Sequence, residues 1–113
     1  MTADEIYLKI GQEISNVIES GNWTNARLEI EIVGEGVVGY TGDYFANNEQ
    51  KDMSVENIDD DITDWLNELH KVTTEGGNNK WNKAIFTLTP DGQFDMEFNW
   101  DQELHDQVEK LSQ

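Results

Sequence analysis

The sequence predicts an α+β fold in two layers, with an antiparallel sheet of four to five strands and helices packed on one face of the sheet. Apolar residues recur at helical spacing in three segments of the chain. Between these segments, apolar and polar residues alternate, as in strands with one buried and one exposed face. Short turns join consecutive strands, which makes those strands antiparallel. The length of 113 residues fits a single domain over 1–113, in the order α-β-β-(β)-α-β-β-α.

The first element is a predicted helix over residues 3–20. Thr2 and Glu5 have the spacing of a capping box, in which a hydroxyl and a carboxylate satisfy free amides of the first turn. Gly21 stands where a left-handed residue commonly follows the end of a helix. The apolar stripe of this helix comprises Ile6, Ile10, Ile14, Val17 and Ile18.

A β-hairpin is predicted next. Apolar residues start to alternate with charged ones at Ala26, and a glycine-rich turn separates this strand from a second strand over 37–44. Gly39 and Gly42 weaken the second strand, and either could mark a bulge in it. Residues 45–53 are polar, and they could extend the hairpin or form a crossing loop.

The second helix is predicted to start after Ser54, an N-cap residue, and to end at Gly76-Gly77. Its apolar stripe comprises Ile58, Ile62, Trp65, Leu66, Leu69 and Val72.

Two more strands and a last helix complete the pattern. A strand over 81–89 leads into a turn at Pro90-Asp91-Gly92, because proline presets φ and glycine accepts positive φ. The following strand, over 93–100, has the cleanest alternation of the chain, and Asp101 is expected to cap the helix after it. The apolar residues of that helix are Leu104, Val108 and Leu111.

Charge is the most unusual property of the chain. Twenty-four acidic residues against seven basic ones give a net charge of −17. Phosphate groups repel such a surface, which argues against direct binding of nucleic acid or of an anionic membrane. A basic protein partner is favoured, because opposite charges steer and accelerate encounter. The acids concentrate in residues 43–64 and 91–113, and a simply well-solvated acidic face remains the alternative interpretation.

No pattern of catalytic or metal-binding residues is present in the sequence. The chain has no cysteine, and its two histidines, His70 and His105, lack partners at zinc-site spacing. Asp59, Asp60 and Asp61 are consecutive, whereas a calcium loop alternates its acids. We therefore expect neither an enzyme nor a bound cofactor or metal. Without an apolar run of about 20 residues or a signal peptide, the expected location is the cytoplasm.

A set of aromatic and glycine positions spans nearly the whole chain. It comprises Ile6-Tyr7, Gly21-Asn22-Trp23, Tyr40, Tyr44, Trp81, Phe86, Leu88, Asp91-Gly92-Gln93-Phe94 and Phe98-Asn99-Trp100-Asp101. In this set the chain resembles the YezG-like immunity proteins, which are encoded beside polymorphic or contact-dependent bacterial toxins. Residues 45–57 have no counterpart in the shared pattern. The resemblance implies that the chain neutralises a cognate toxin domain, often a nuclease, without cofactor or catalysis.

The predicted partner-binding residues are acids, and Glu29 and Glu31 would join them if the last strand lies beside the first hairpin. The aromatic residues Trp81, Phe94, Phe98 and Trp100 are expected in the core instead. Two alternatives remain open: a binding module or nucleic-acid mimic for another basic protein, and a small carboxylate-using enzyme or metal-dependent regulator. The predicted set comprises Asp43, Glu49, Asp52, Glu56, Asp59, Asp60, Asp61, Asp64, Asp95 and Glu97.

Overall fold

The computed structural model describes residues 1–18, 21–34, 36–75 and 80–111. Its five strands form one antiparallel sheet in the order β3-β2-β1-β4-β5. With the helices, this is the α+β class and the element order that the sequence predicts, which are confirmed. The elements are α1 (Ala3–Val17), β1 (Trp23–Gly34), β2 (Val37–Ala46), β3 (Glu49–Asp52), the 3-10 helix η1 (Val55–Asn57), α2 (Ile62–Thr74), β4 (Lys83–Leu88), β5 (Phe94–Asn99) and α3 (Gln102–Leu111).

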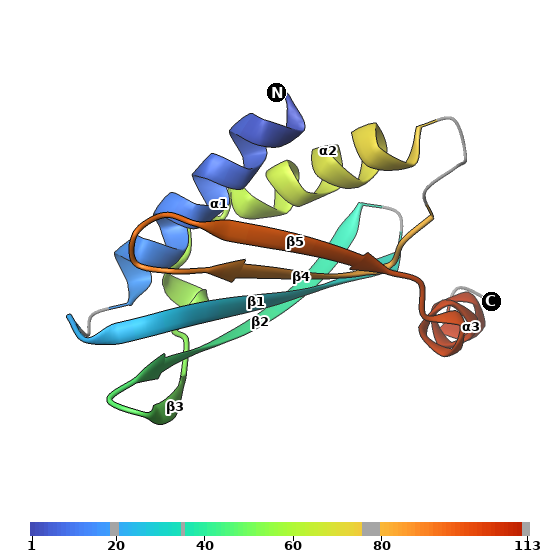
Figure 1. The fold of residues 1–113 in the computed structure, drawn as a ribbon. Coiled ribbons are helices and arrows are strands. Elements are labelled where there is room, and N and C mark those ends of the chain that lie inside the picture. The colour runs from blue at the N-terminus through green and yellow to red at the C-terminus, as the bar shows by residue number, and fades with distance from the viewer. Residues whose placement is uncertain (19–20, 35, 76–79, 112–113) are drawn as a thin grey trace.

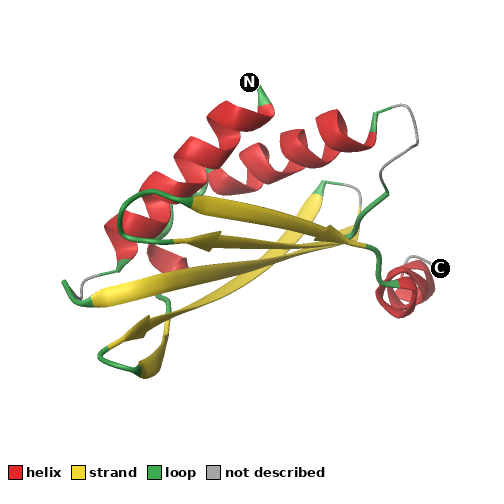
Figure 2. Cartoon of the chain, viewed as in Figure 1, coloured by secondary structure: helices red, strands yellow, loops and turns green. Residues whose placement is uncertain are grey.

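Helices α1 and α2 lie on one face of the sheet, whereas α3 lies beyond one end of it (Figure 1). The core forms between this helix pair and the sheet. Leu28 and Ile30 of β1 and Phe86 of β4 are fully buried against the isoleucine stripe of α1 and the apolar stripe of α2. The opposite face of the sheet carries neither α1 nor α2 (Figure 2).

Helix α1 starts as predicted and ends earlier. The capping box of Thr2 and Glu5 is present, with both reciprocal hydrogen bonds. The helix stops at Val17, because Ile18 turns to extended backbone and places its side chain in the core. The N–H of Ile18 still donates to the carbonyl oxygen of Ile14. The predicted left-handed Gly21 is wrong, since its φ is not positive, and residues 19–20 lie outside the described residues.

The polar stretch over 45–53 extends the hairpin, one of the two predicted outcomes. Asn47 and Asn48 have positive φ values of 55° and 63°, the backbone of a tight two-residue hairpin turn, and the chain returns as β3. Neither Gly39 nor Gly42 marks a bulge, because the register shifts between β1 and β2 lie at the two ends of β1. Gly42 serves packing instead: a Cβ atom there would stand 2.9 Å from the sulfur of Met53.

Helix α2 starts at Ile62, eight residues after the predicted cap Ser54, and that prediction is wrong. Ser54 precedes the 3-10 helix η1 and makes no side-chain capping hydrogen bond. Met53 and Ile58 are both buried in the core. Because their burial holds the chain between β3 and α2 against the core, this segment does not form one continuous helix. The predicted end of the helix at Gly76-Gly77 lies outside the described residues.

Trp81 joins α2 to the sheet. Its side chain is buried, its indole N–H donates to the hydroxyl of Thr73 at 2.7 Å, and its carbonyl oxygen lies 2.9 Å from Nε2 of His70. The other three aromatic residues predicted for the core are not buried: Phe94 is 44 %, Phe98 37 % and Trp100 43 % exposed. That prediction is wrong for Phe94 and Phe98 because they belong to edge strand β5, which α1 and α2 cover only partly, and for Trp100 because it follows the end of β5, before α3.

Helix α3 is capped by Asp101, as predicted, through the N–H of Leu104 to Oδ1 of Asp101 at 3.0 Å. The side chain of Asn82 bonds both the backbone N–H and the carbonyl oxygen of Asp101, and it thereby holds the start of α3. No residue of the helix is fully buried, and the apolar side chain of Leu111 is 87 % exposed.

Candidate functional site

The face of the sheet opposite α1 and α2 carries mostly polar and charged side chains. In β1, Leu28 and Ile30 point to the helices, and the intervening residues point to the other side, because side chains alternate along a strand. We call this other side the open face. Its residues are Asn25, Arg27, Glu29 and Glu31 of β1, Thr41, Asp43 and Phe45 of β2, Gln50 and Asp52 of β3, Lys83, Ile85 and Thr87 of β4, and Asp95, Glu97 and Asn99 of β5.

The strand register arranges the open face in rows that run across the sheet. One row reads Asp52, Asp43, Arg27, Thr87 and Asp95 from β3 to β5.

The neighbouring row places Ile85 between Glu29 and Glu97. Neighbouring strands lie about 4.8 Å apart, so the two glutamates are separated by roughly 10 Å. The single apolar side chain of Ile85 is therefore flanked by carboxylates on both sides. The whole open face carries six carboxylates and two cations, Arg27 and Lys83.

Arg27 neutralises only one part of this surface. Its guanidinium lies 3.0 Å from Oδ2 of Asp43 and 3.6 Å from Oε1 of Glu29. The side-chain amide of Gln50 donates to the same Asp43 oxygen at 2.9 Å. Within the described ranges, Asp52, Asp95 and Glu97 make no ion pair. Their charges are available to a partner.

Lys83 lies between two carboxylates at the α3 end of the open face. Its ammonium is 2.9 Å from Asp101 and 3.8 Å from Glu31, and the hydrogen bond to Asp101 raises the pKa of Lys83. The pKa of Asp101 is lowered, first by the backbone N–H of Leu104 and then by Lys83. A hollow of about 210 Å³ opens beside this pair, with Glu29, Glu31, Lys83, Ile85 and Asn99 among its walls.

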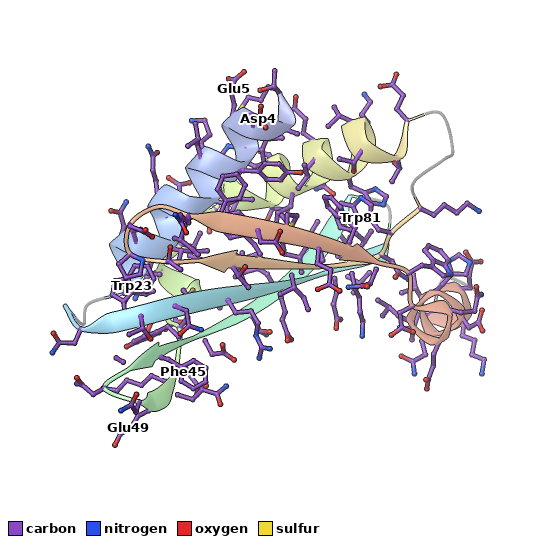
Figure 3. The ribbon with its side chains drawn as sticks, in the orientation of Figure 1. Asp4, Glu5, Trp23, Phe45, Glu49 and Trp81 are labelled. Atoms are coloured by element: carbon purple, nitrogen blue, oxygen red, sulfur yellow. The ribbon has the colours of Figure 1, made fainter. Side chains whose placement is uncertain are left out.

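The structure divides the ten predicted partner-binding residues between two surfaces. Asp43, Asp52, Asp95 and Glu97 lie on the open face. Glu49 starts β3 at the corner of the sheet, close to Phe45 and far from Trp81 (Figure 3). Of the remaining acids, Glu56 lies in η1, Asp59 and Asp60 lie between η1 and α2, and Asp61 and Asp64 lie at the start of α2.

Asp60 illustrates this second location. The side chain of Tyr40 points from β2 toward the helices and packs against the core. The pKa of the Tyr40 hydroxyl is raised, mainly by burial and secondarily by the nearby negative charge of Asp60. Asp60 therefore lies on the helix side of the sheet. The acidic block that is continuous in sequence from residue 43 to 64 is not continuous in space.

Strand β5 does not lie beside the first hairpin, because β4 separates it from β1. Glu29 and Glu31 nevertheless share the open face with Asp95 and Glu97. The sequence prediction left out the two cations and Ile85. Strand alternation gives the side on which each residue lies, but only the strand order places them together.

Both histidines contact neighbouring groups of the fold. Nε2 of His70 contacts the carbonyl oxygen of Trp81, and the ring of His105 lies 5.1 Å from that of Trp100. Over the part of the chain that the structure describes, no three potential ligands gather in a way that could hold a metal ion. In the same part, each helix is too short or too polar to cross a membrane.

No family model matches this chain, and no curated protein is significantly similar to it. The resemblance to YezG-like immunity proteins therefore stays a prediction from the sequence.

Proposed function

We propose that this chain is an immunity protein that binds and neutralises a cognate bacterial toxin domain in the cytoplasm. The proposed toxin domain is a basic nuclease, and the acidic open face of the sheet covers it. The observation that carries the proposal is a sheet face that neither α1 nor α2 covers and on which six carboxylates outnumber two cations.

The charge of the open face supports a basic partner. Asp43 and Asp52 stand directly opposite each other on neighbouring strands, although like charges in such pairs destabilise a sheet. Arg27 offsets part of this repulsion through its ion pair with Asp43, and a cationic partner surface would offset more of it on binding. A nuclease carries such a surface, because it has to attract phosphate groups.

The shape of the open face supports a protein partner. Ile85 gives it a half-buried apolar centre, and Glu29 and Glu97 flank that centre. Protein interfaces commonly combine an apolar centre with a polar rim. The helix-side acids, including Asp59 and Asp64, act in this proposal at longer range, by attracting the toxin before contact.

The resemblance predicted from the sequence favours the immunity function over a general acidic module. The two functions differ in selectivity. An immunity protein discriminates sharply between its cognate toxin and others, whereas a nucleic-acid mimic binds several unrelated basic proteins.

Co-expression in bacteria tests the proposal. The toxin domain encoded beside this gene is induced with and without the immunity protein, and an unrelated basic nuclease toxin serves as control. We expect growth to be rescued only for the cognate toxin, and a 1:1 mixture of purified proteins to lose nuclease activity. Absence of rescue would contradict the immunity function, and equal inhibition of both nucleases would support the acidic module instead.

A further inference from the structure

The two edges of the sheet differ in how well they are protected. The β3 edge has four residues, all of them exposed and polar or charged, which discourages pairing with another strand. The β5 edge has six residues and presents Phe94 and Phe98, both more than one-third exposed. In the described part of the chain, no strand lies beyond β5. The β5 edge is therefore the one suited to pairing.

The hydrogen bonds fix which backbone groups of β5 point outward. The N–H of Thr89 donates to the carbonyl oxygen of Gln93, so the backbone C=O group of Gln93 points toward β4. Backbone groups of successive strand residues point in opposite directions, so the N–H and C=O groups of Phe94, Met96 and Phe98 point away from β4. These three residues offer donors and acceptors to an added strand.

Two hollows lie next to this edge on the helix side. One, of about 410 Å³, is bounded by Tyr7 and Leu8 of α1 and by Phe94. The other, of about 490 Å³, is bounded by Val72, Trp81 and Phe98. Phe94 and Phe98 are four residues apart, which is about 13 Å along a strand. Alternate side chains of an added strand would reach both hollows, and such pockets provide specificity when a strand is added to a sheet.

On the other side of β5, Asp95 and Glu97 point to the open face without an ion pair within the described ranges. An added strand would place its intervening side chains beside these two carboxylates. Basic side chains fit there, and acidic ones do not.

From these observations we infer that the β5 edge binds an extended segment of a basic protein, in which apolar and basic residues alternate. The apolar side chains would enter the two hollows, and the basic ones would lie beside Asp95 and Glu97. The inference rests on the proposed function for the nature of the partner, and it assigns to that partner a strand that continues the sheet.

A second copy of this chain is a poorer occupant. Antiparallel pairing of two β5 strands with Met96 opposite Met96 places Asp95 of each copy opposite Glu97 of the other. Like charges in directly opposed positions destabilise strand pairing. The edge is therefore complementary to a basic strand and repels its own copy.

A synthetic peptide of alternating lysine and leucine tests the inference without any toxin. Titration into the whole protein, followed by NMR, is expected to protect the amides of Phe94, Met96 and Phe98 from hydrogen exchange. A peptide with glutamate in place of lysine, and one N-methylated at alternate residues, are expected to bind at least about tenfold more weakly. Equal binding of either control peptide, or no protection of these amides, would overturn the inference.

Two variants at one position separate the backbone from the side chain. Met96→Pro removes an N–H that points outward, and proline is tolerated at such edge positions. Met96→Ala keeps the N–H. We expect the proline variant to fold and to bind the lysine–leucine peptide about tenfold more weakly than the alanine variant.

Equal affinities of the two Met96 variants would overturn strand addition, as would a concentration-dependent dimer that Met96→Pro abolishes. If the peptide binds as expected and the toxin domain does not bind, the proposed function fails and the edge assignment stands.

Discussion

The two faces of the sheet carry side chains from the same strands and have opposite chemistry. Leu28, Ile30 and Phe86 on the covered face are fully buried under α1 and α2, whereas Glu29, Glu31 and Thr87 on the open face reach the surface or its boundary. The covered face stabilises the fold. The open face concentrates unbalanced negative charge, which contributes little to stability and is available for binding.

The largest expected difference between the faces is in the cost of truncating a side chain. Leu28→Ala removes a fully buried side chain and is expected to lower the free energy of unfolding by about 2–5 kcal/mol. Its neighbour Glu29 lies on the open face, and Glu29→Ala is expected to change this free energy by no more than about 0.5 kcal/mol. Urea denaturation of both variants measures the difference. Similar losses of unfolding free energy in both variants would show that the side chain of Glu29 on the open face stabilises the fold as much as that of Leu28 does.

Two glycines of β2, one on each face of the sheet, are expected to give smaller stability changes of opposite sign when replaced by alanine. Gly42→Ala places a Cβ atom 2.9 Å from the sulfur of Met53 and 3.1 Å from the carbonyl oxygen of Arg27. This overpacking is expected to cost about 1–3 kcal/mol. Gly39 lies on the open face with no neighbour within 4 Å, and Gly39→Ala is expected to stabilise by about 0.5–1 kcal/mol. Thermal unfolding of the two variants measures whether Gly42→Ala lowers and Gly39→Ala raises the stability. Destabilisation by Gly39→Ala would show that the open face has no room for a Cβ atom at this position.

The smallest expected effect concerns the end of the open face at α3. Because the folded-state pKa of Asp101 is lowered, its carboxylate stabilises the folded chain above the ordinary carboxyl range and loses this contribution as the pH falls through the folded-state pKa. We therefore expect the amide of Leu104 to lose protection from hydrogen exchange on acidification before the strand amides do. In Asp101→Asn, which can still cap the helix, the acid-dependent step should disappear. Persistence of the step in that variant would assign it to another carboxylate.

The class and order of the elements could be predicted from the sequence, whereas some of their boundaries and their neighbours in space could not. Periodicity predicted the helix stripes, the capping box of Thr2 and the alternation of β1, because each depends on local chemistry. The start of α2 at Ile62 was missed because burial of Met53 and Ile58 overrides the cap at Ser54. Burial outweighs a single cap in energy.

The candidate site was predicted only in part for the same reason. Asp43 and Asp64 belong to one acidic block in sequence, yet they lie on β2 and in the first turn of α2. Arg27 and Lys83 balance part of the charge of the open face, and only the strand register reveals this. Phe94 was expected in the core because strand alternation cannot show that β5 is an edge strand.

We propose that the open face, and not the negative charge as a whole, contacts the toxin domain. Two triple variants with identical net charge separate these possibilities. One reverses Glu29, Asp95 and Glu97 to lysine on the open face, and the other reverses Asp59, Asp60 and Asp61 to lysine on the helix side. Both variants weaken electrostatic attraction, so both are expected to slow association with the toxin domain by roughly tenfold.

The dissociation rate of the proposed toxin complex, measured for both triple variants by surface-based kinetics, distinguishes contact at the open face from attraction at long range. We expect the open-face variant to dissociate on the order of 100-fold faster than the unmodified protein, because its lysines face cations of the partner. The helix-side variant is expected to keep the original dissociation rate. A faster dissociation rate in the helix-side variant alone, or the same increase in both variants, would show that the open face is not the specific contact surface.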